Sequence, residues 1–258
     1  MRLDEAVAAR TGMTRSQARS LIMEGRVRVG GEPAAKAGQR VREDVEITVE
    51  EPRRFVSRGG EKLAAALDAF AIDANGANAL DIGASTGGFT DALLQRGAAH
   101  VTAVDVGYGQ LDWKLRNDPR VSVMERTNFR LLTDDAFAEP FELIAIDTSF
   151  ISLRTILARA AGFLAPGGRV VALVKPQFEA GRERLGRGGV VRDPAVHRAV
   201  LREVREAATA LGLPPAGLIA SPLLGPAGNR EFLVVLHRGA VPIDDERIDR
   251  VVGEGTTS

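Results

Sequence analysis

The sequence contains no cysteine, so disulfides, thiolate metal ligands and a cysteine nucleophile are excluded. Its three histidines are scattered along the chain, and we therefore expect no metal site. No apolar run approaches the roughly 20 residues of a membrane span, and the first residues lack the apolar segment of a secretory signal. These absences predict a cytoplasmic protein that makes no contact with a membrane.

Lysine is also rare, since only four of the 34 basic residues are lysines, at positions 36, 62, 114 and 175. In a chain that uses arginine by default, a lysine is a mild indication that an ammonium group is required. The net charge is zero, so the molecule as a whole has no field that attracts nucleic acid. Residues 1–42 nevertheless hold nine basic and four acidic side chains, and any basic surface should lie there.

Residues 1–50 have the pattern of a small α+β unit. Thr14 stands three residues before Gln17, which is the spacing of a capping box, and it predicts the start of a helix that ends at Gly25. Short strands with alternating valine and arginine follow. A stripe of arginines on such a unit suits contact with an RNA backbone, although a solvated arginine face remains the alternative. The candidate RNA-binding residues of this unit are Arg2, Arg15, Arg19, Arg26 and Arg28.

A linker is predicted over residues 51–58, because charge and proline coincide there with the absence of an apolar period. Seven short apolar runs follow, with helical segments between the early ones, at residues 79–82, 101–106, 121–124, 143–147, 170–174, 217–220 and 232–236. This order is typical of a doubly wound α/β sheet, which we place in residues 59–240. Residues 241–258 carry no motif, and we expect a frayed C-terminal tail.

A glycine-bearing turn joins the first apolar run to a helix and is the strongest single motif. It reads Asp81-Ile82-Gly83-Ala84-Ser85-Thr86-Gly87-Gly88-Phe89-Thr90 and matches neither the dinucleotide fingerprint nor a P-loop. Asp105 ends the next run, where its carboxylate could accept hydrogen bonds from both hydroxyls of a ribose. S-adenosylmethionine is therefore a better candidate than NAD, with a purely structural turn as the alternative. The candidate cofactor-binding residues are Asp81, Gly83, Ser85, Thr86, Gly87, Gly88, Phe89, Asp105 and Val106.

Four charged residues are expected at one edge of the sheet. Asp147 and Lys175 end the fourth and fifth apolar runs, so both should lie where parallel sheets bind their ligands. Glu231 begins the seventh run, which reaches the same edge if that strand is antiparallel and lies beside the fifth. Lys62 precedes the first run on a helix that could bring it there. Ordinary surface ion pairs, each worth under about 1 kcal/mol, are the alternative.

The ordered motifs of the whole chain closely resemble the TlyA family of ribosomal RNA 2'-O-methyltransferases. The match spans residues 1 to about 238 and is specific because it includes both parts of the chain. Its residues are Arg2-Leu3-Asp4, Ser16, Arg19, Ile22, Gly25, Val27, Val29 and Gly31; then Ser57-Arg58-Gly59-Gly60-Glu61-Lys62-Leu63, the glycine turn, Ala103-Val104-Asp105-Val106-Gly107, Asp147-Thr148-Ser149-Phe150, Lys175-Pro176-Gln177-Phe178-Glu179 and Gly228-Asn229-Arg230-Glu231. The resemblance implies an S4-like RNA-binding domain followed by a Rossmann-like, seven-stranded class I methyltransferase domain of the FtsJ type.

The resemblance also implies that Lys62, Asp147, Lys175 and Glu231 are the catalytic tetrad of 2'-O-methyl transfer. A ribose hydroxyl is a poor nucleophile, so a nearby amine must take its proton or stabilise the alkoxide, and Lys175 is the candidate. Carboxylates beside a lysine favour its ammonium form and disfavour it as a base, whereas Lys62 and the sulfonium act in the opposite direction. We therefore expect Lys175 to be essential and leave open whether it is the base.

A loop with three arginines and one acid follows the fifth apolar run, at residues 181–189. It should lie over the ligand edge of the sheet, where Arg182, Arg184 and Arg187 are candidates for phosphate contact. A flexible, solvated loop is the alternative interpretation for each of these arginines.

The sequence thus predicts an S-adenosylmethionine-dependent enzyme that methylates the 2'-oxygen of a ribose. Following the resemblance, the substrate is a cytidine in 16S or 23S ribosomal RNA, within ribosomal subunits, and the reaction needs no metal. The first alternative is a ribosome-assembly factor that binds RNA without catalysis. The second is a membrane-active hemolysin, a label used in this family, for which no amphipathic cationic helix or apolar span provides support.

Overall fold

The computed structural model describes residues 1–50 and 54–254, and it divides into two compact units, Met1–Arg54 and Phe55–Ser258. Most of the expected linker, residues 51–53, lies outside the described residues. Each unit has its own hydrophobic core and is described by itself. No helix in the described ranges is long and apolar enough to cross a bilayer.

The first unit is a helix pair on a three-stranded antiparallel sheet. Its elements are α1 (Leu3–Thr11), α2 (Arg15–Met23), β1 (Val27–Val29), β2 (Glu32–Pro33) and β3 (Ile47–Val49), in the sheet order β2-β1-β3. The predicted capping box is confirmed, since Thr14 Oγ1 accepts from Gln17 N at 3.3 Å and Gln17 Oε1 accepts from Thr14 N at 2.9 Å. Both helices bury their apolar faces on the sheet, around Leu3, Ile22 and Val27.

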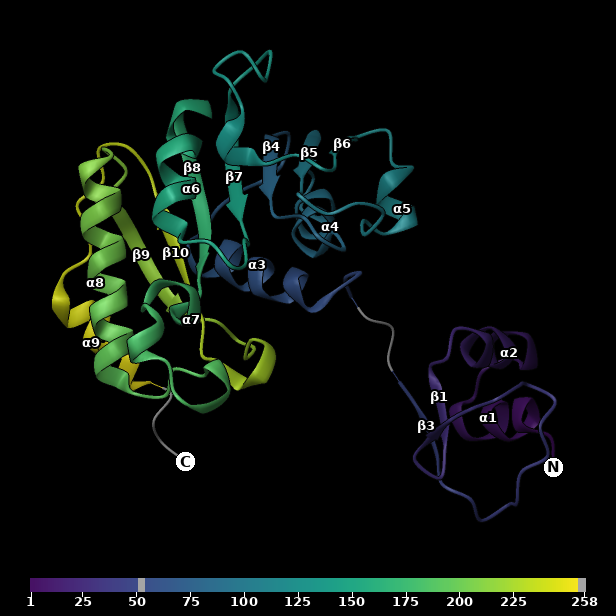
Figure 1. Cartoon of the computed structure of the whole chain (residues 1–258). Helices are drawn as coiled ribbons and strands as arrows, with labels where there is room; N and C mark the ends of the chain where they lie inside the picture. The colour runs from purple at the N-terminus through teal and green to yellow at the C-terminus, as the bar shows by residue number, and fades with distance from the viewer. Residues whose placement is uncertain (51–53, 255–258) are drawn as a thin grey trace. The chain divides into compact units, whose positions relative to one another are not determined.

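The second unit contains a seven-stranded sheet, and each predicted apolar run is confirmed as a strand (Figure 1). The strand order is β6-β5-β4-β7-β8-β10-β9. The last strand in sequence pairs antiparallel with β8 and β9, which confirms the expected place of the seventh run beside the fifth. The strands are β4 (Asn78–Ile82), β5 (His100–Val104), β6 (Val121–Met124), β7 (Phe141–Ile146), β8 (Leu164–Val174), β9 (Pro215–Ala220) and β10 (Phe232–Leu236).

Helices cover both faces of this sheet and give three layers (Figure 1). Residues that alternate along β4 belong to different cores, with Leu80 and Ile82 on one face and Ala79 on the other. One core includes α3 (Arg58–Ala69), α4 (Gly88–Gln95) and α5 (Trp113–Arg116); the other includes α6 (Leu153–Ala160), α8 (Pro194–Ala210) and α9 (Asp245–Gly253). The short helices are α7 (Pro176–Glu179), η1 (Phe129–Leu131), η2 (Ala161–Phe163), η3 (Arg182–Arg184), η4 (Arg187–Gly189) and η5 (Pro226–Gly228).

The expectation of a frayed tail from residue 241 is wrong, because most of this segment forms α9. Ile248, Val251 and Val252 are fully buried in the core beneath α8. Arg198 of α8 pairs with Asp249 of α9 at 2.8 Å, so the acidic residues of the segment face arginines of α8 rather than solvent alone. Residues 255–258, the end of the predicted tail, lie outside the described residues.

Candidate active site

The four predicted catalytic residues lie together around one cavity at the edge of the sheet. Asp147 and Lys175 directly follow β7 and β8, and Glu231 directly precedes β10. Because Phe232 pairs with Val174 in the antiparallel register, Glu231 comes next to Lys175. Lys62 reaches the same place from α3. The cavity has a volume of about 310 Å³ and also includes Ser149 and part of the glycine turn.

These four side chains form two ion pairs. Lys62 Nζ donates to Glu231 Oε2 at 2.5 Å, and the two side chains are only 8% and 0% exposed. Lys175 Nζ lies 2.6 Å from Asp147 Oδ1 and donates to Ser149 Oγ at 2.9 Å. The charges are compensated pairwise, as burial requires, and both ammonium groups are held at the wall of the same cavity.

The glycine turn after β4 lies against the end of β7 and the start of α3, next to two of the predicted catalytic residues. A Cβ at Gly83 would lie 2.5 Å from the carbonyl oxygen of Asp147, so only glycine lets the turn approach the end of β7 so closely. A Cβ at Gly88 would lie 2.2 Å from Ser57 Oγ and 2.8 Å from Gly60 N, at the start of α3. These two glycines therefore let the turn pack closely against both the end of β7 and the start of α3.

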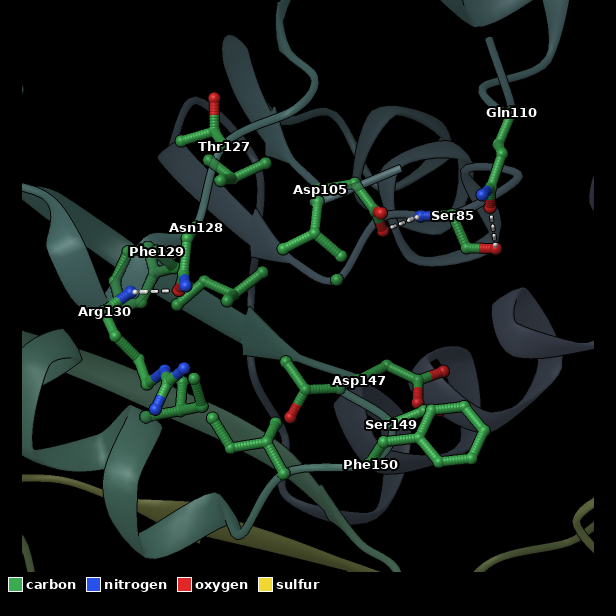
Figure 2. A pocket seen from close by; sticks show the side chains of 17 residues that line it. Ser85, Asp105, Gln110, Thr127, Asn128, Phe129, Arg130, Asp147, Ser149 and Phe150 are labelled. Carbon is green, nitrogen blue, oxygen red and sulfur yellow. Dashed lines mark hydrogen bonds between the residues drawn. The ribbon is translucent and has the colours of Figure 1, made fainter. Parts of the chain in front are cut away.

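A second cavity, of about 470 Å³, continues from the first, with which it shares Gly83, Ser85, Asp147 and Ser149. Figure 2 shows Asp105 pointing toward Ser85 on one side, with Asp147 and Phe150 on the other. Asp105 Oδ2 accepts from Ser85 N at 2.8 Å, and its Oδ1 accepts from Gly107 N at 2.6 Å. The carboxylate is thereby fixed at the end of β5 while it still lines the cavity.

The predicted cofactor residues divide into those that line a cavity and those that do not. Seven of them line at least one of the two cavities: Gly83, Ser85, Thr86, Gly88, Phe89, Asp105 and Val106. Gly87 lines neither and is the N-cap residue of α4, with a φ of 95°. Asp81 also lines neither, because its side chain is buried behind the turn.

Asp81 stabilises the turn from inside. Its Oδ2 accepts from Thr90 Oγ1 of α4 at 2.6 Å, whereas its buried Oδ1 has no hydrogen-bond partner among the residues that the structure describes. Burial, with a smaller contribution from the nearby carboxylates of Asp147 and Asp105, raises the pKa of Asp81 to about 7. The buried position of Asp81 behind this turn therefore makes ionisation of its carboxyl group unfavourable.

Comparison with known proteins identifies the family. The FtsJ-like methyltransferase family matches residues 55–238, and the S4 domain matches residues 1–47. Over 237 residues the chain is 50% identical to the 16S/23S rRNA (cytidine-2'-O)-methyltransferase TlyA of Mycobacterium tuberculosis, a match that covers 90% of this chain and 88% of that protein. The chain belongs to the TlyA family.

Two further relatives agree with this membership. The "Putative rRNA methyltransferase YqxC" of Bacillus subtilis is 48% identical over 248 residues, which are 93% of this chain and 88% of that protein. A solved structure described as "Putative hemolysin from Streptococcus thermophilus" has 44% identity and a TM-score of 0.77, and covers 98% of this chain and 94% of that one. The TlyA-family chain is thus a methyltransferase with an FtsJ-like domain and an S4 domain, and hemolysin is the name of a relative.

Three of the predicted RNA-binding arginines gather on one carboxylate in the S4 domain. Arg2 and Arg15 lie 3.0 and 3.1 Å from the buried carboxylate of Asp4, and Arg19 lies at 3.6 Å. Hydrogen bonds, first from Arg2 and then from Arg15, hold the pKa of Asp4 down at about 2. About half of each arginine side chain stays exposed, so this cluster keeps an outward-facing positive charge.

The other predicted RNA-binding arginines are placed differently. Arg26 and Arg28 both donate to Glu50, through its carbonyl and its carboxylate respectively. Arg184 donates to Glu203 Oε1 at 3.2 Å and to the carbonyl of Ala180, which ties it to its own domain. Arg187 is exposed, and the side chain of Arg182 lies outside the described parts of the chain.

Phe150 was not among the site residues predicted from the sequence, although it belongs to one of the family motifs. Its side chain is 90% exposed at the rim of the larger cavity, and its backbone has a φ of 64°. Its ring lies 5.0 Å from that of Phe178, centroid to centroid. An exposed aromatic ring on a backbone with positive φ does not stabilise the fold, and these two properties make Phe150 a candidate site residue.

Proposed function

We propose that this TlyA-family methyltransferase transfers a methyl group from S-adenosylmethionine to the 2'-oxygen of a cytidine in 16S or 23S ribosomal RNA. The observation that carries the proposal is the pair of lysine–carboxylate ion pairs, Lys175–Asp147 and Lys62–Glu231, in one cavity beside the glycine turn. The names of the curated relatives support the substrate. Because the proposed substrate is ribosomal RNA, the reaction would take place in the cytoplasm.

The larger cavity fits a nucleoside-type methyl donor. When bound, S-adenosylmethionine supplies the methyl group on a sulfonium. Asp105 would accept hydrogen bonds from the ribose hydroxyls of the donor, and Val106 and Phe129 offer apolar contact for its base. Gly83, Ser85, Thr86, Gly88 and Phe89 would hold the remainder near the smaller cavity, while Asp81 and Gly87 act by shaping the turn.

The tetrad would prepare the ribose hydroxyl for attack. As the hydroxyl oxygen bonds to the methyl carbon and the carbon–sulfur bond breaks, the hydroxyl proton must leave. Lys175 either accepts that proton as a neutral amine, or as an ammonium it stabilises the developing alkoxide while the proton passes to water. Asp147 and Ser149 hold its Nζ for this task. Lys62 and Glu231 would keep the hydroxyl in line with the methyl group, the positioning that supplies much of the rate.

The RNA would contact both domains. In the S4 domain, a groove between α2 and residues 34–37 is lined by Arg19, Lys36 and the hydroxyls of Ser16 and Ser20, which together suit a phosphate backbone. In the methyltransferase domain, the exposed ring of Phe150 offers a surface on which the target base can stack.

Transfer of labelled methyl from S-adenosylmethionine to unmethylated ribosomal subunits tests the proposal. Ribose methylation blocks alkaline cleavage, so the label should appear in an alkali-resistant dinucleotide that contains cytidine. Label in a mononucleotide would identify a base methyltransferase instead. Binding of S-adenosylmethionine without transfer to either subunit would favour the non-catalytic assembly factor.

A further inference from the structure

The four-residue helix α7 connects the parts of the catalytic site. Lys175 directly precedes it and occupies its N-cap position. Gln177 Nε2 donates to Glu231 Oε1 at 3.4 Å, and the ring of Phe178 lies 5.0 Å from that of Phe150. Its last residue, Glu179, reaches the start of α6. The single turn of α7 therefore contacts the segment that carries Glu231, the loop that carries Phe150 and the start of α6.

Glu179 is a buried carboxylate that caps another helix. Its Oε1 accepts from the backbone N–H of Leu153 at 2.6 Å, and its Oε2 accepts from Ser152 Oγ at 2.7 Å. Leu153 is the first residue of α6, whose initial amides have no partner within the helix. Glu179 thus satisfies a buried donor and places negative charge at the positive end of α6, where Arg154 Nε also lies 3.6 Å from its Oε2.

The capped end of α6 is also the end of the loop that carries Asp147, Ser149 and Phe150. The loop is fixed at its beginning, where Asp147 N donates to the carbonyl of Ile82 at 3.0 Å. At its other end Glu179 holds Ser152 and Leu153. Lys175 and this loop meet at Ser149 and Asp147, so the separation between α7 and α6 determines whether Lys175 Nζ reaches both partners.

We propose that Glu179 is a positioning residue for methyl transfer, which sets the loop of Asp147 and Ser149 against Lys175 by capping α6. This inference rests on the proposed function. Glu179 lines neither cavity, so its effect on the reaction passes through the loop and not through contact with a substrate.

The test compares Glu179→Ala and Glu179→Gln with wild type, as full-length protein, by steady-state methyl transfer to unmethylated ribosomal subunits. Glu179→Ala should lower kcat by about 10- to 100-fold, the effect of a misplacement of about 1 Å, with a smaller change in KM for the subunits. Glu179→Gln should recover most of this kcat, because its amide oxygen can still accept from Leu153 N. Asp244→Ala is the matched control, since Asp244 caps α9 through Arg247 N at 2.8 Å but lies at neither cavity.

Thermal unfolding of each variant separates positioning from stability. We expect Asp244→Ala to lose stability but to keep kcat at a temperature where all variants are folded. A folded Glu179→Ala enzyme with wild-type kcat would overturn the inference, as would a folded Glu179→Gln enzyme that is as slow as Glu179→Ala. If wild type itself transfers no methyl group, the proposed function fails, and this result is distinguishable from either of the others.

Discussion

At the level of single residues, this protein buries several carboxylates, and each of them has different partners. Glu231 faces an ammonium group and Asp4 faces three guanidinium groups, whereas Glu179 faces a helix N-terminus and the guanidinium of Arg154. Asp81 is the exception, because its hydrogen bonds come from Thr90, a neutral residue. Its burial therefore opposes ionisation, whereas the environment of Asp4 favours it.

Asp81 should make the stability of the protein depend on pH. The folded state holds the proton of Asp81 up to a pKa of about 7, whereas the unfolded chain releases it near the ordinary value of 3.8. The contribution of Asp81 to the free energy of unfolding should therefore fall as the pH rises from about 4 to about 7 and stay constant above that.

The variant Asp81→Asn removes this titration and keeps an acceptor for Thr90. Its stability relative to wild type should increase between pH 5 and pH 8, which urea unfolding at both values can measure. Asp244→Asn, an exposed carboxylate, is the control. A difference between Asp81→Asn and wild type that is the same at both pH values would contradict the buried, protonated state.

At the residue scale, the sequence was sufficient to place the tetrad but not the contacts behind it. Lys175 and Asp147 could be placed because each follows an apolar run, and strand ends share one edge of a parallel sheet. The cap that Glu179 provides depends on the approach of α7 to α6, and the exposure of Phe150 depends on the shape of the rim. Neither property is encoded in the local pattern of residues.

At the scale of elements, two loops that are distant in sequence are joined by one buried side chain. Asn229 Oδ1 accepts from Val191 N at 3.0 Å, and its Nδ2 donates to the carbonyl of Gly189 at 3.2 Å. The loop that includes Arg187 is therefore attached to the segment that presents Glu231. A buried amide that satisfies two backbone groups costs free energy when it is removed.

Asn229→Ala should loosen the loop at residues 186–191 and raise KM for ribosomal subunits, with little change in the affinity for S-adenosylmethionine. Amide hydrogen exchange should become faster at Val191, whose N–H loses its acceptor. Asn117→Ala removes an exposed amide and should leave both quantities unchanged. Unaltered exchange over residues 186–191 in Asn229→Ala would show that Asn229 does not hold the loop.

The strands of the large sheet could be predicted from the sequence, whereas the helix α9 could not. All seven strands of the large sheet were predicted, because apolar runs between helical segments are a strong local signal. The helix α9 was missed because its many charged residues obscured Ile248, Val251 and Val252, which are spaced for one helical face. Those charges pair with arginines of α8, a tertiary effect that local propensity does not contain.

At the scale of the whole molecule, the net charge is zero, but the two units arrange their charges differently. The S4 domain keeps positive charge on its surface through the arginines around Asp4. In the methyltransferase domain, the charges of the four predicted catalytic residues are compensated in pairs. We therefore expect affinity for RNA to depend chiefly on the first unit and turnover on the second.

Arg19→Gln tests this division. The substitution should weaken binding to ribosomal subunits and reduce the slope of log affinity against log salt by about 0.7–0.9, the value for one lost phosphate contact. The affinity for S-adenosylmethionine should stay at the wild-type value. A salt titration of subunit binding measures the slope, with Arg116→Gln, an exposed arginine of the other unit, as the control. An unchanged slope in Arg19→Gln would place the RNA contact elsewhere.

A catalytic role of the tetrad is tested most directly by the single-turnover rate of methyl transfer in Lys175→Ala, with wild type and Lys114→Ala in parallel at saturating subunits and S-adenosylmethionine. Loss of the Lys175 ammonium should lower the rate by about 10²–10⁴-fold, the usual contribution of a positioned acid or base, while both substrates still bind. Lys114 is exposed on α5, and its loss should leave the rate unchanged. A near-wild-type rate in Lys175→Ala would contradict a catalytic role of Lys175 and the tetrad.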